Sequence, residues 1–239
     1  MRKIYRQRKT RPAFGRTQFR QKDSATVQLG IRAWDMSNHH MSLELGPAER
    51  ILKAALGVFA TYGFEGATTR EIARRANVKQ PQISYHFESK ELLWKAAADT
   101  IFEEFDRALK ANMQDAVDDD DRLYRLVRTF VSFVARNPEW FAFVIHEGFQ
   151  AGERNQWLIK KWLKPQSQAM YRILIGKKWP KMNGRDMSQA MSILSILSGS
   201  TGIFAQRFQV EKISGLNILS DDFISAHARN LCIAIKNVV

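Results

Sequence analysis

Six polar side chains gather within eight residues of the chain, and their types suit contacts with DNA. They are Lys79, Gln80, Gln82, Ser84, Tyr85 and His86. A glutamine amide can pair with adenine through two hydrogen bonds in the major groove, and a lysine ammonium can reach guanine or phosphate. Hydroxyl and ring N–H groups suit phosphate oxygens. No acidic residue interrupts this run, so the pattern predicts a surface that reads DNA.

Motifs for catalysis or metal binding are incomplete. His146-Glu147 is similar to the start of a zinc-protease helix, but the second histidine would be needed at the position of Gln150. The phosphate loop that would end at Gly176 lacks its upstream glycine, and no Gly-x-Ser-x-Gly elbow occurs. Four carboxylates at 118–121 suit a helix N-terminus. We expect no catalytic residue, metal site or cofactor, which disfavours the alternative of a helical enzyme.

Hydrophobic periodicity predicts the elements that hold the polar run. Apolar residues at helical spacing indicate a first helix over 47–63. Thr68 and Glu71 have the capping-box spacing that starts a short second helix, and Asn77 tolerates the left-handed conformation of a tight turn. A third short helix follows over about 80–87. Such an order is typical of a helix-turn-helix, although a fragment of another helical bundle with a solvated face has the same pattern.

The rest of the chain also has helical periodicity. Ser89 caps a fourth helix, and further helices are predicted from Asp118, from Pro138, over about 187–210 and over about 222–239, with another through residues 157–174 between them. No strand-period segment exceeds a few residues, so the class is all-α. We expect a basic, disordered arm over 1–45, a DNA-binding domain over 46–94 and a helical ligand-binding and dimerisation domain over 95–239.

The run from Ile51 to Leu93 resembles the N-terminal domain of the TetR family of regulators. The resemblance is carried by Phe59-Ala60-x-x-Gly63-Phe64, Thr68-Thr69-Arg70-Glu71-Ile72-Ala73, Ala76-Asn77-Val78 and Tyr85-His86-Phe87-x-Ser89-Lys90-Glu91-Leu92-Leu93. It implies a homodimer of about nine helices per subunit, in which the first three bind an operator and the others bind an inducer. This chain departs from the family at Asn77, where glycine is usual, and at Ser84, where an aromatic residue is usual.

The resemblance also implies roles for individual residues. Those that match base-facing positions are Arg70, Gln80, Pro81, Gln82, Ser84 and Tyr85. Those that match phosphate-binding positions are Thr69, His86 and Lys90. With Lys79, these form the predicted DNA-binding set.

Charge and composition limit the alternatives. The formal net charge of the 239 residues is +13, and residues 1–46 hold ten Lys or Arg against three Asp or Glu. This arm could bind phosphates, but a basic run is more often a solvated tail. Met36 and Met41 lie near its end, and either could start translation. No secretory signal is present and the longest apolar stretch is too polar to cross a bilayer, so we expect a cytoplasmic protein that has no membrane partner.

Large aromatic residues in the second half predict a core that could also enclose an apolar ligand. The expected ligand-binding residues are Phe130, Phe133, Trp140, Phe143, His146, Trp157 and Phe204, with His146 as a polar anchor. Small residues between Ser195 and Ala205 predict close contact of this helix with the same helix and the 224–238 helix of a second copy. We therefore expect a homodimeric transcriptional regulator that binds a double-stranded DNA operator and is released by a small-molecule inducer. The alternative is a non-specific or nucleoid-associated DNA-binding protein.

Overall fold

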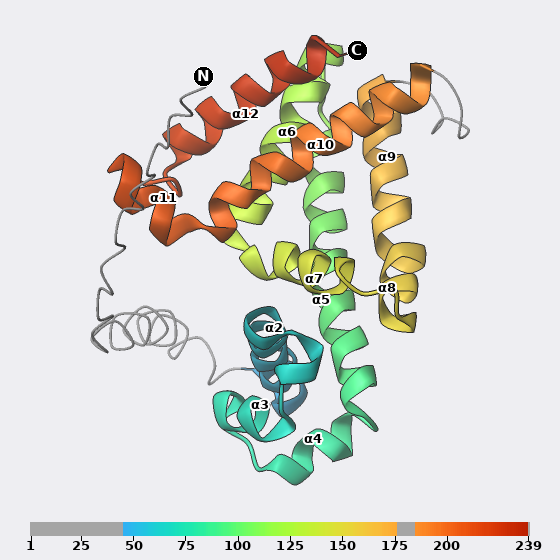
Figure 1. The fold of residues 1–239 in the computed structure, drawn as a ribbon, viewed down its shortest axis with the longest axis vertical. Coiled ribbons are helices and arrows are strands. Elements are labelled where there is room, and N and C mark those ends of the chain that lie inside the picture. Colours follow the sequence, from blue (N-terminus) through green and yellow to red (C-terminus); the bar gives the residue numbers. More distant parts are fainter. Residues whose placement is uncertain (1–44, 176–184, 239) are drawn as a thin grey trace, which may run out of the picture. The chain divides into compact units, whose positions relative to one another are not determined.

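The computed structural model describes residues 45–175 and 185–238, and every regular element within these ranges is a helix (Figure 1). The all-α prediction is therefore confirmed. The predicted basic arm and the region of Gly176 lie outside the described residues. Gly46–Val239 form one compact unit.

The first three helices are α2 (Pro47–Gly66), α3 (Thr69–Ala76) and α4 (Gln80–His86). The Oγ1 atom of Thr68 caps α3 by accepting from the backbone N–H of Glu71 at 3.2 Å. Asn77 follows α3 with φ 52° and ψ 51°, which is the left-handed turn that its side chain was expected to tolerate. The cap and the turn together set the angle between α3 and α4.

The first helix differs from its prediction at its C-terminal end. It was expected to end at Gly63, but helical structure resumes beyond this residue as far as Gly66. Gly63 itself has φ 66° and ψ −179°, a conformation that essentially only glycine adopts. The result is a kink with a final helical turn after it.

Helix α5 (Lys90–Met113) begins in the predicted DNA-binding domain, 46–94, and continues far beyond it. Ser89 caps this helix by accepting from Leu92 N–H at 3.1 Å, as its sequence predicted. The predicted domain boundary between residues 94 and 95 falls inside this continuous helix. Its buried side chains lie on both sides of that boundary and belong to one continuous core. They are Leu93, Trp94, Ala97, Ala98, Ile101, Phe102, Phe105 and Leu109.

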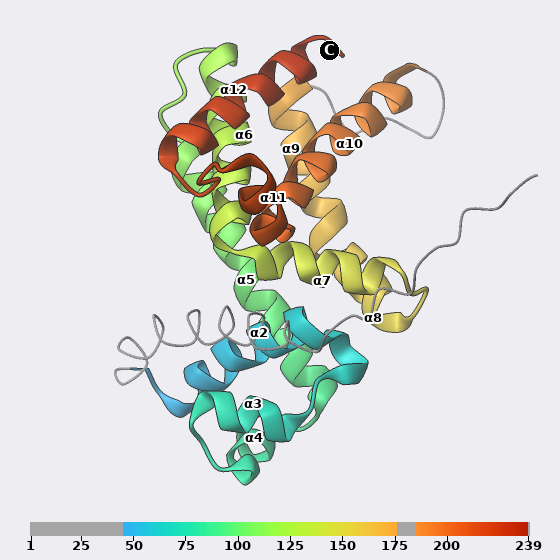
Figure 2. The ribbon, with the colours of Figure 1, turned by 60° about the vertical axis from the view of Figure 1, so that its left-hand side comes forward.

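Four helices follow α5. They are α6 (Asp119–Arg136), α7 (Pro138–Gly148), α8 (Glu153–Leu158) and α9 (Lys164–Ile175), with a π-helical turn at Ile159–Leu163 between the last two. Helix α7 packs against α2, α5 and α10, so it connects the first helices with the last ones (Figures 1 and 2). The helix expected to pass through residues 157–174 thus starts earlier and contains a wide turn that side-chain periodicity did not reveal.

The last elements are α10 (Arg185–Ala205), α11 (Arg207–Ser214) and α12 (Asp221–Lys236). The single helix predicted over about 187–210 was wrong, because the chain leaves helical geometry at Gln206, with φ −99° and ψ 23°. The preceding turn contains Gly202, which favours helix weakly, and α11 buries no side chain that would hold it in line with α10. Figure 2 shows α11 as a separate helix after α10.

Candidate nucleic-acid interface

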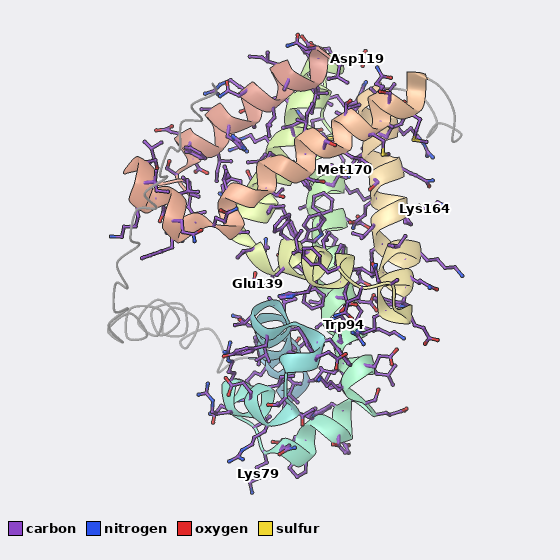
Figure 3. All side chains as sticks on the ribbon, in the orientation of Figure 1. Lys79, Trp94, Asp119, Glu139, Lys164 and Met170 are labelled. Carbon is purple, nitrogen blue, oxygen red and sulfur yellow. The ribbon has the colours of Figure 1, made fainter. Side chains whose placement is uncertain are left out.

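The predicted DNA-binding set lies on the N-terminus of α3, on α4 and at the start of α5. Seven of its ten side chains are exposed, while Thr69, Gln82 and Lys90 are half-buried. Figure 3 shows Lys79 at the outer edge of the α3–α4 region. The residues beneath them are apolar and buried, which anchors the two helices. These are Ile72, Ala73, Ala76 and Ile83.

Gln80 is joined to α3 by its side-chain amide. Its Nε2 atom lies 3.2 Å from the Oγ1 atom of Thr69, which connects two members of the predicted set across the turn. The amide retains its carbonyl oxygen and a second N–H. Gln80 can therefore still accept from adenine N6 and donate to N7.

Gln82 is held differently, because its side chain caps its own helix. The Oε1 atom accepts from the backbone N–H of Lys79 at 3.0 Å, which satisfies one of the donors at the start of α4. In this position the oxygen is engaged and the N–H groups remain. Gln82 as held here can donate to a base, but a two-bond pair with adenine would have to share the oxygen that caps the helix.

Tyr85 and His86 extend the set toward the end of α4. The tyrosine side chain is 85% exposed, and its ring packs edge-on against His86 at 5.1 Å between ring centroids. Lys90 begins α5 with its Nζ atom 3.5 Å from the carbonyl oxygen of Glu65. These groups place hydroxyl, imidazole and ammonium donors beside the helix that would enter the groove.

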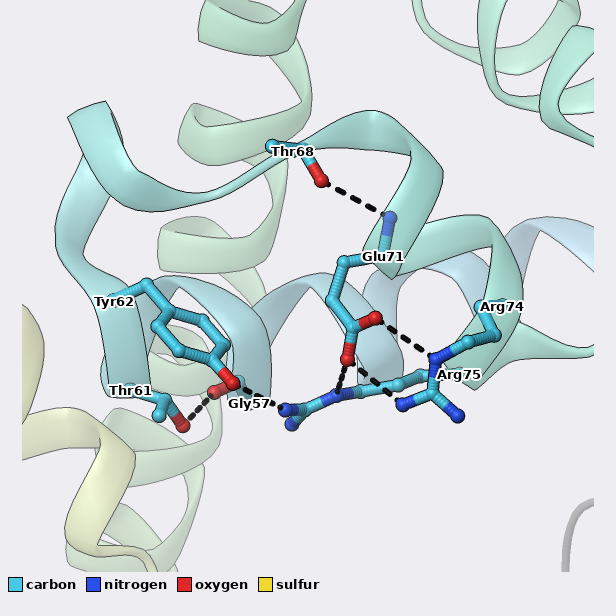
Figure 4. A network of polar contacts seen from close by, with 7 residues as sticks. All are labelled: Gly57, Thr61, Tyr62, Thr68, Glu71, Arg74 and Arg75. Carbon is cyan, nitrogen blue, oxygen red and sulfur yellow. Dashed lines mark hydrogen bonds and ion pairs between the residues drawn. The ribbon is translucent and has the colours of Figure 1, made fainter.

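A charged network, which the sequence analysis did not predict, lies within α3 and connects it to α2. Glu71 accepts hydrogen bonds from Arg74 at 2.8 Å and from Arg75 at 2.8 Å, and Arg75 also reaches the hydroxyl of Tyr62 at 3.4 Å (Figure 4). The hydrogen bond from Arg74 is the main cause that lowers the pKa of Glu71 to about 2. The signal was present in the sequence, since the two arginines lie three and four positions after the glutamate on one helical face.

The seven predicted ligand-binding residues do not converge on one place. Phe130, Phe133 and Trp140 surround Phe105, with ring centroids 5.9, 5.1 and 5.9 Å from it. We call these four residues the central aromatic cluster. The three predicted residues are on α6 and α7, and the sequence prediction did not include Phe105.

The other four predicted residues lie elsewhere. Phe143 and Trp157 pack on Trp94, at 5.4 and 5.7 Å between centroids. Phe204 packs against His227 at the α10–α12 contact, at 6.1 Å. His146 is half-buried and its Nε2 atom lies 2.9 Å from the carbonyl oxygen of Ala60 in α2.

Two buried polar groups lie at the central aromatic cluster, one on Gln166, which the sequence prediction did not include, and one on Trp140, which it did. Gln166 donates from Nε2 to the Phe102 carbonyl at 3.1 Å and to Asp106 at 2.7 Å, and its Oε1 atom has no partner among the described residues. The indole N–H of Trp140 likewise has none. The position of Gln166 one helical turn after Trp162 could have indicated its inward direction. These atoms could orient a polar group of a ligand.

The cleft between α6, α9 and α12 and the single cysteine lie apart from the predicted site residues. A cleft of about 620 Å³ between α6, α9 and α12 is lined by charged side chains that include Asp119, Arg122 and Arg172, and none of the seven predicted residues lines it. Burial raises the pKa of the Cys232 thiol to about 11, as suits a structural cysteine. Within the described ranges, no acidic, histidine or cysteine residues form a metal-binding group, and no helix is long and apolar enough to cross a membrane.

Comparison with known proteins identifies the N-terminal helices. Residues 51–97 match the model of the tetR family of bacterial regulatory proteins. The HTH-type transcriptional repressor NicS of Pseudomonas putida is 31% identical over 104 residues, which are 44% of this chain and 49% of that protein. The biofilm operon regulator IcaR of Staphylococcus aureus is 25% identical over 83 residues, which are 35% of this chain and 45% of that protein. The chain thus spans about half the length of these curated relatives.

Solved structures extend the likeness of fold to most of the chain. A TetR-like regulator from Rhodococcus sp. RHA1 has a TM-score of 0.62 at 16% identity and covers 80% of this chain and 94% of that one. The fatty acid degradation regulator FadR from Bacillus halodurans has a TM-score of 0.62 at 17% identity, with 80% and 95% covered. At such identities the likeness establishes the architecture.

Proposed function

We propose that this chain, a member of the TetR family of bacterial regulatory proteins, binds a specific DNA operator as a homodimer and represses transcription in the cytoplasm until a small ligand releases it. The observation that carries the proposal is the exposed surface of α4 on a buried apolar base, with Gln80 free to form a two-bond pair with adenine. NicS is named a repressor and IcaR a negative regulator, which favours repression over activation.

The recognition helix in this proposal is α4. Gln80, with Arg70 and Ser84 beside it, would contact the bases of the operator. Thr69 and Lys90 would contact its phosphates. Base contacts carry sequence discrimination and phosphate contacts carry most of the affinity that all sequences share. The short side chain of Ser84 leaves room that an aromatic residue would fill, so this position would contribute little to base preference.

Dimerisation in this proposal uses α10 and α12. Ser195, Ser198, Gly199 and Ala205 are exposed on α10, whereas Ser200 faces the interior. Small exposed side chains let a second helix approach closely. A two-fold axis at this face would present two α4 helices to adjacent major grooves, about 34 Å apart along the DNA.

The ligand in this proposal is apolar or aromatic and contacts the central aromatic cluster. Phe130, Phe133 and Trp140 supply rings there, and the free oxygen of Gln166 and the Trp140 N–H supply polar groups. His146 is not the anchor in this version, because its ring N–H is directed to Ala60.

A binding comparison tests the proposal. The protein is titrated with DNA from upstream of its own gene and with random DNA at the same salt concentration, because affinities at different salt concentrations cannot be compared. We expect a preference of at least about 10³-fold for the upstream DNA. Equal affinity for the two DNAs would favour the alternative of a non-specific or nucleoid-associated protein.

A further inference from the structure

The kink in α2 is covered by a side chain from the second half of the protein. Gly63 is buried, and a Cβ atom placed there would lie 3.3 Å from the Nδ1 atom of His146. The other ring nitrogen, Nε2, lies 2.9 Å from the carbonyl oxygen of Ala60. A carbonyl only accepts, so Nε2 carries the hydrogen and donates. The departure from helical geometry at Gly63 interrupts the turn that this carbonyl would close, which explains why a donor from α7 is used there.

The residue after the kink is held by a second contact from the same side. The guanidinium of Arg154, in α8, lies 3.7 Å from the ring centroid of Phe64. Its Nη2 atom is 3.4 Å from a carboxylate oxygen of Glu65. A cation that stacks on an aromatic face gains most where water is excluded, and the Arg154 side chain is only 18% exposed. Arg154 thus fixes the last turn of α2.

Arg154 is itself anchored by a buried carboxylate. Its Nε atom donates to Oε1 of Glu147 at 3.2 Å, and the Glu147 side chain is 3% exposed. The second oxygen of Glu147 has no hydrogen-bond partner among the described residues, so the arginine is its main compensation. A buried charge that lost this partner would be costly, which keeps Arg154 in one orientation.

The same turn of α2 is connected to the predicted DNA-binding set. Lys90, a predicted phosphate contact, lies with Nζ 4.5 Å from the Phe64 ring and 3.5 Å from the Glu65 carbonyl. Phe64 therefore carries a cation from α8 and a cation from the start of α5. Movement of Arg154 would displace the ring on which Lys90 rests.

We propose that His146 and Arg154 are positioning residues for DNA binding, which hold the kink of α2 and through it set the placement of α3, α4 and Lys90. The inference rests on the proposed function. Helix α7 also contributes Trp140 to the central aromatic cluster, so a shift of this helix would alter packing at that cluster and the hydrogen bond to Ala60 together.

Substitutions at these two positions test the proposal with two measurements on the full chain. Arg154→Met removes the charge and the planar group, and Arg154→Lys restores the charge alone. His146→Ala removes the donor, and His146→Gln restores a side-chain N–H at about the same reach. Arg125→Met is the matched control, because it removes an arginine whose ion pair, at 2.7 Å to Asp121, stays within α6.

The first measurement is affinity for the DNA that the wild-type protein enriches from a random pool. We expect Arg154→Met and His146→Ala to weaken binding about tenfold, within the range of typical coupling between sites, with the same base preference as wild type. His146→Gln recovers most of the loss and Arg154→Lys recovers part of it. The second measurement is amide hydrogen exchange, in which we expect faster exchange over 47–88 and unchanged exchange in α10 and α12.

The outcomes separate the proposals. Wild-type affinity and exchange in Arg154→Met and His146→Ala would overturn the positioning role, and so would faster exchange that spreads evenly through all helices, since this indicates general destabilisation. If the wild-type protein enriches no sequence, the proposed function fails. The exchange measurement then still decides whether these residues hold the α2 kink.

Discussion

The two glutamines at the start of α4 have the same side chain but different expected roles, because their hydrogen bonds differ. Gln80 retains a donor and an acceptor for a base, whereas Gln82 uses its oxygen to cap the helix. We expect Gln80→Ala to remove about 1–3 kcal/mol of discrimination between operator and random DNA. We expect Gln82→Ala to lower the free energy of unfolding by about 0.5–2 kcal/mol, with a smaller effect on discrimination.

Titrations of the two variants with operator DNA and with random DNA, together with urea unfolding, check that Gln80 contacts a base and that Gln82 caps the helix. A larger loss of base preference in Gln82→Ala than in Gln80→Ala would contradict it, because it would mean that the cap opens on the DNA. Lys90→Ala is a useful comparison. It removes the proposed phosphate contact of Lys90, so it is expected to weaken binding to all sequences alike.

Glu71 makes the stability of the DNA-binding helices depend on acid. Its pKa in the folded protein is lowered from 4.5 to about 2, chiefly by the hydrogen bond from Arg74. A carboxylate with a lowered folded pKa contributes stability that is complete above pH 4.5 and is lost as the pH falls from there to about 2. We expect Glu71→Gln to flatten the dependence of the unfolding free energy on pH in this window. An unchanged slope, measured by urea unfolding between pH 5 and pH 3, would mean that the Glu71 carboxylate does not form these bonds in solution.

At the scale of elements, local signals predicted the limits of α3, α4 and α12 well, and they missed the kink in α2 and the breaks inside the later helices. The Thr68 cap, the Asn77 turn and the Ser89 cap depend on one or two side chains and their own backbone, so their residue types were sufficient. The π-helical turn before α9 and the break at Gln206 interrupt segments whose side-chain spacing stays helical. Helical periodicity alone therefore did not reveal them.

The same difference explains the candidate sites. The predicted DNA-binding residues share one short segment, so helical periodicity was enough to place most of them on an exposed surface. The predicted ligand residues come from α6, α7, α8 and α10, and aromatic type alone cannot tell a ring in the central aromatic cluster from one beside Trp94. His146 shows the limit most clearly, since its partner is a backbone carbonyl 86 positions away.

The kink of α2 gives a prediction at the scale of this element. A side chain at Gly63 would be strained at φ 66°, and its Cβ would lie 3.3 Å from the His146 ring. We expect Gly63→Ala to lower the free energy of unfolding by about 1–3 kcal/mol. Gly148→Ala is the matched control, because a Cβ there meets nothing within 4 Å. Equal stability of the two variants in urea unfolding would show that the kink is not required.

At the scale of the whole molecule, the exposed Gly199 and the half-buried Gly202 of α10 give a test of the proposed dimer. A Cβ at Gly199 would meet nothing within 4 Å, and one at Gly202 would meet only the end of the Gln206 side chain at 3.9 Å. We therefore expect Gly199→Leu combined with Gly202→Leu to leave the subunit folded and to block close approach of a second copy. Sedimentation is then expected to report a monomer for the double variant and a dimer for the wild-type protein. A stable dimer of the double variant would place the interface elsewhere.

The continuity of α5 has a consequence for recombination between related regulators. Leu93 and Trp94 near the start of α5 and Phe102 and Phe105 farther along it belong to one buried core, in which Trp94 packs on Phe143 and Phe105 packs on Trp140. A chimaera joined near residue 94 would set foreign side chains against this core. It would also rotate one half of α5 relative to the other by about 100° for each residue gained or lost at the joint. Exchange of specificity is therefore expected to succeed by substitution on the outer surface of α4, and transfer of the entire N-terminal segment requires repacking along α5.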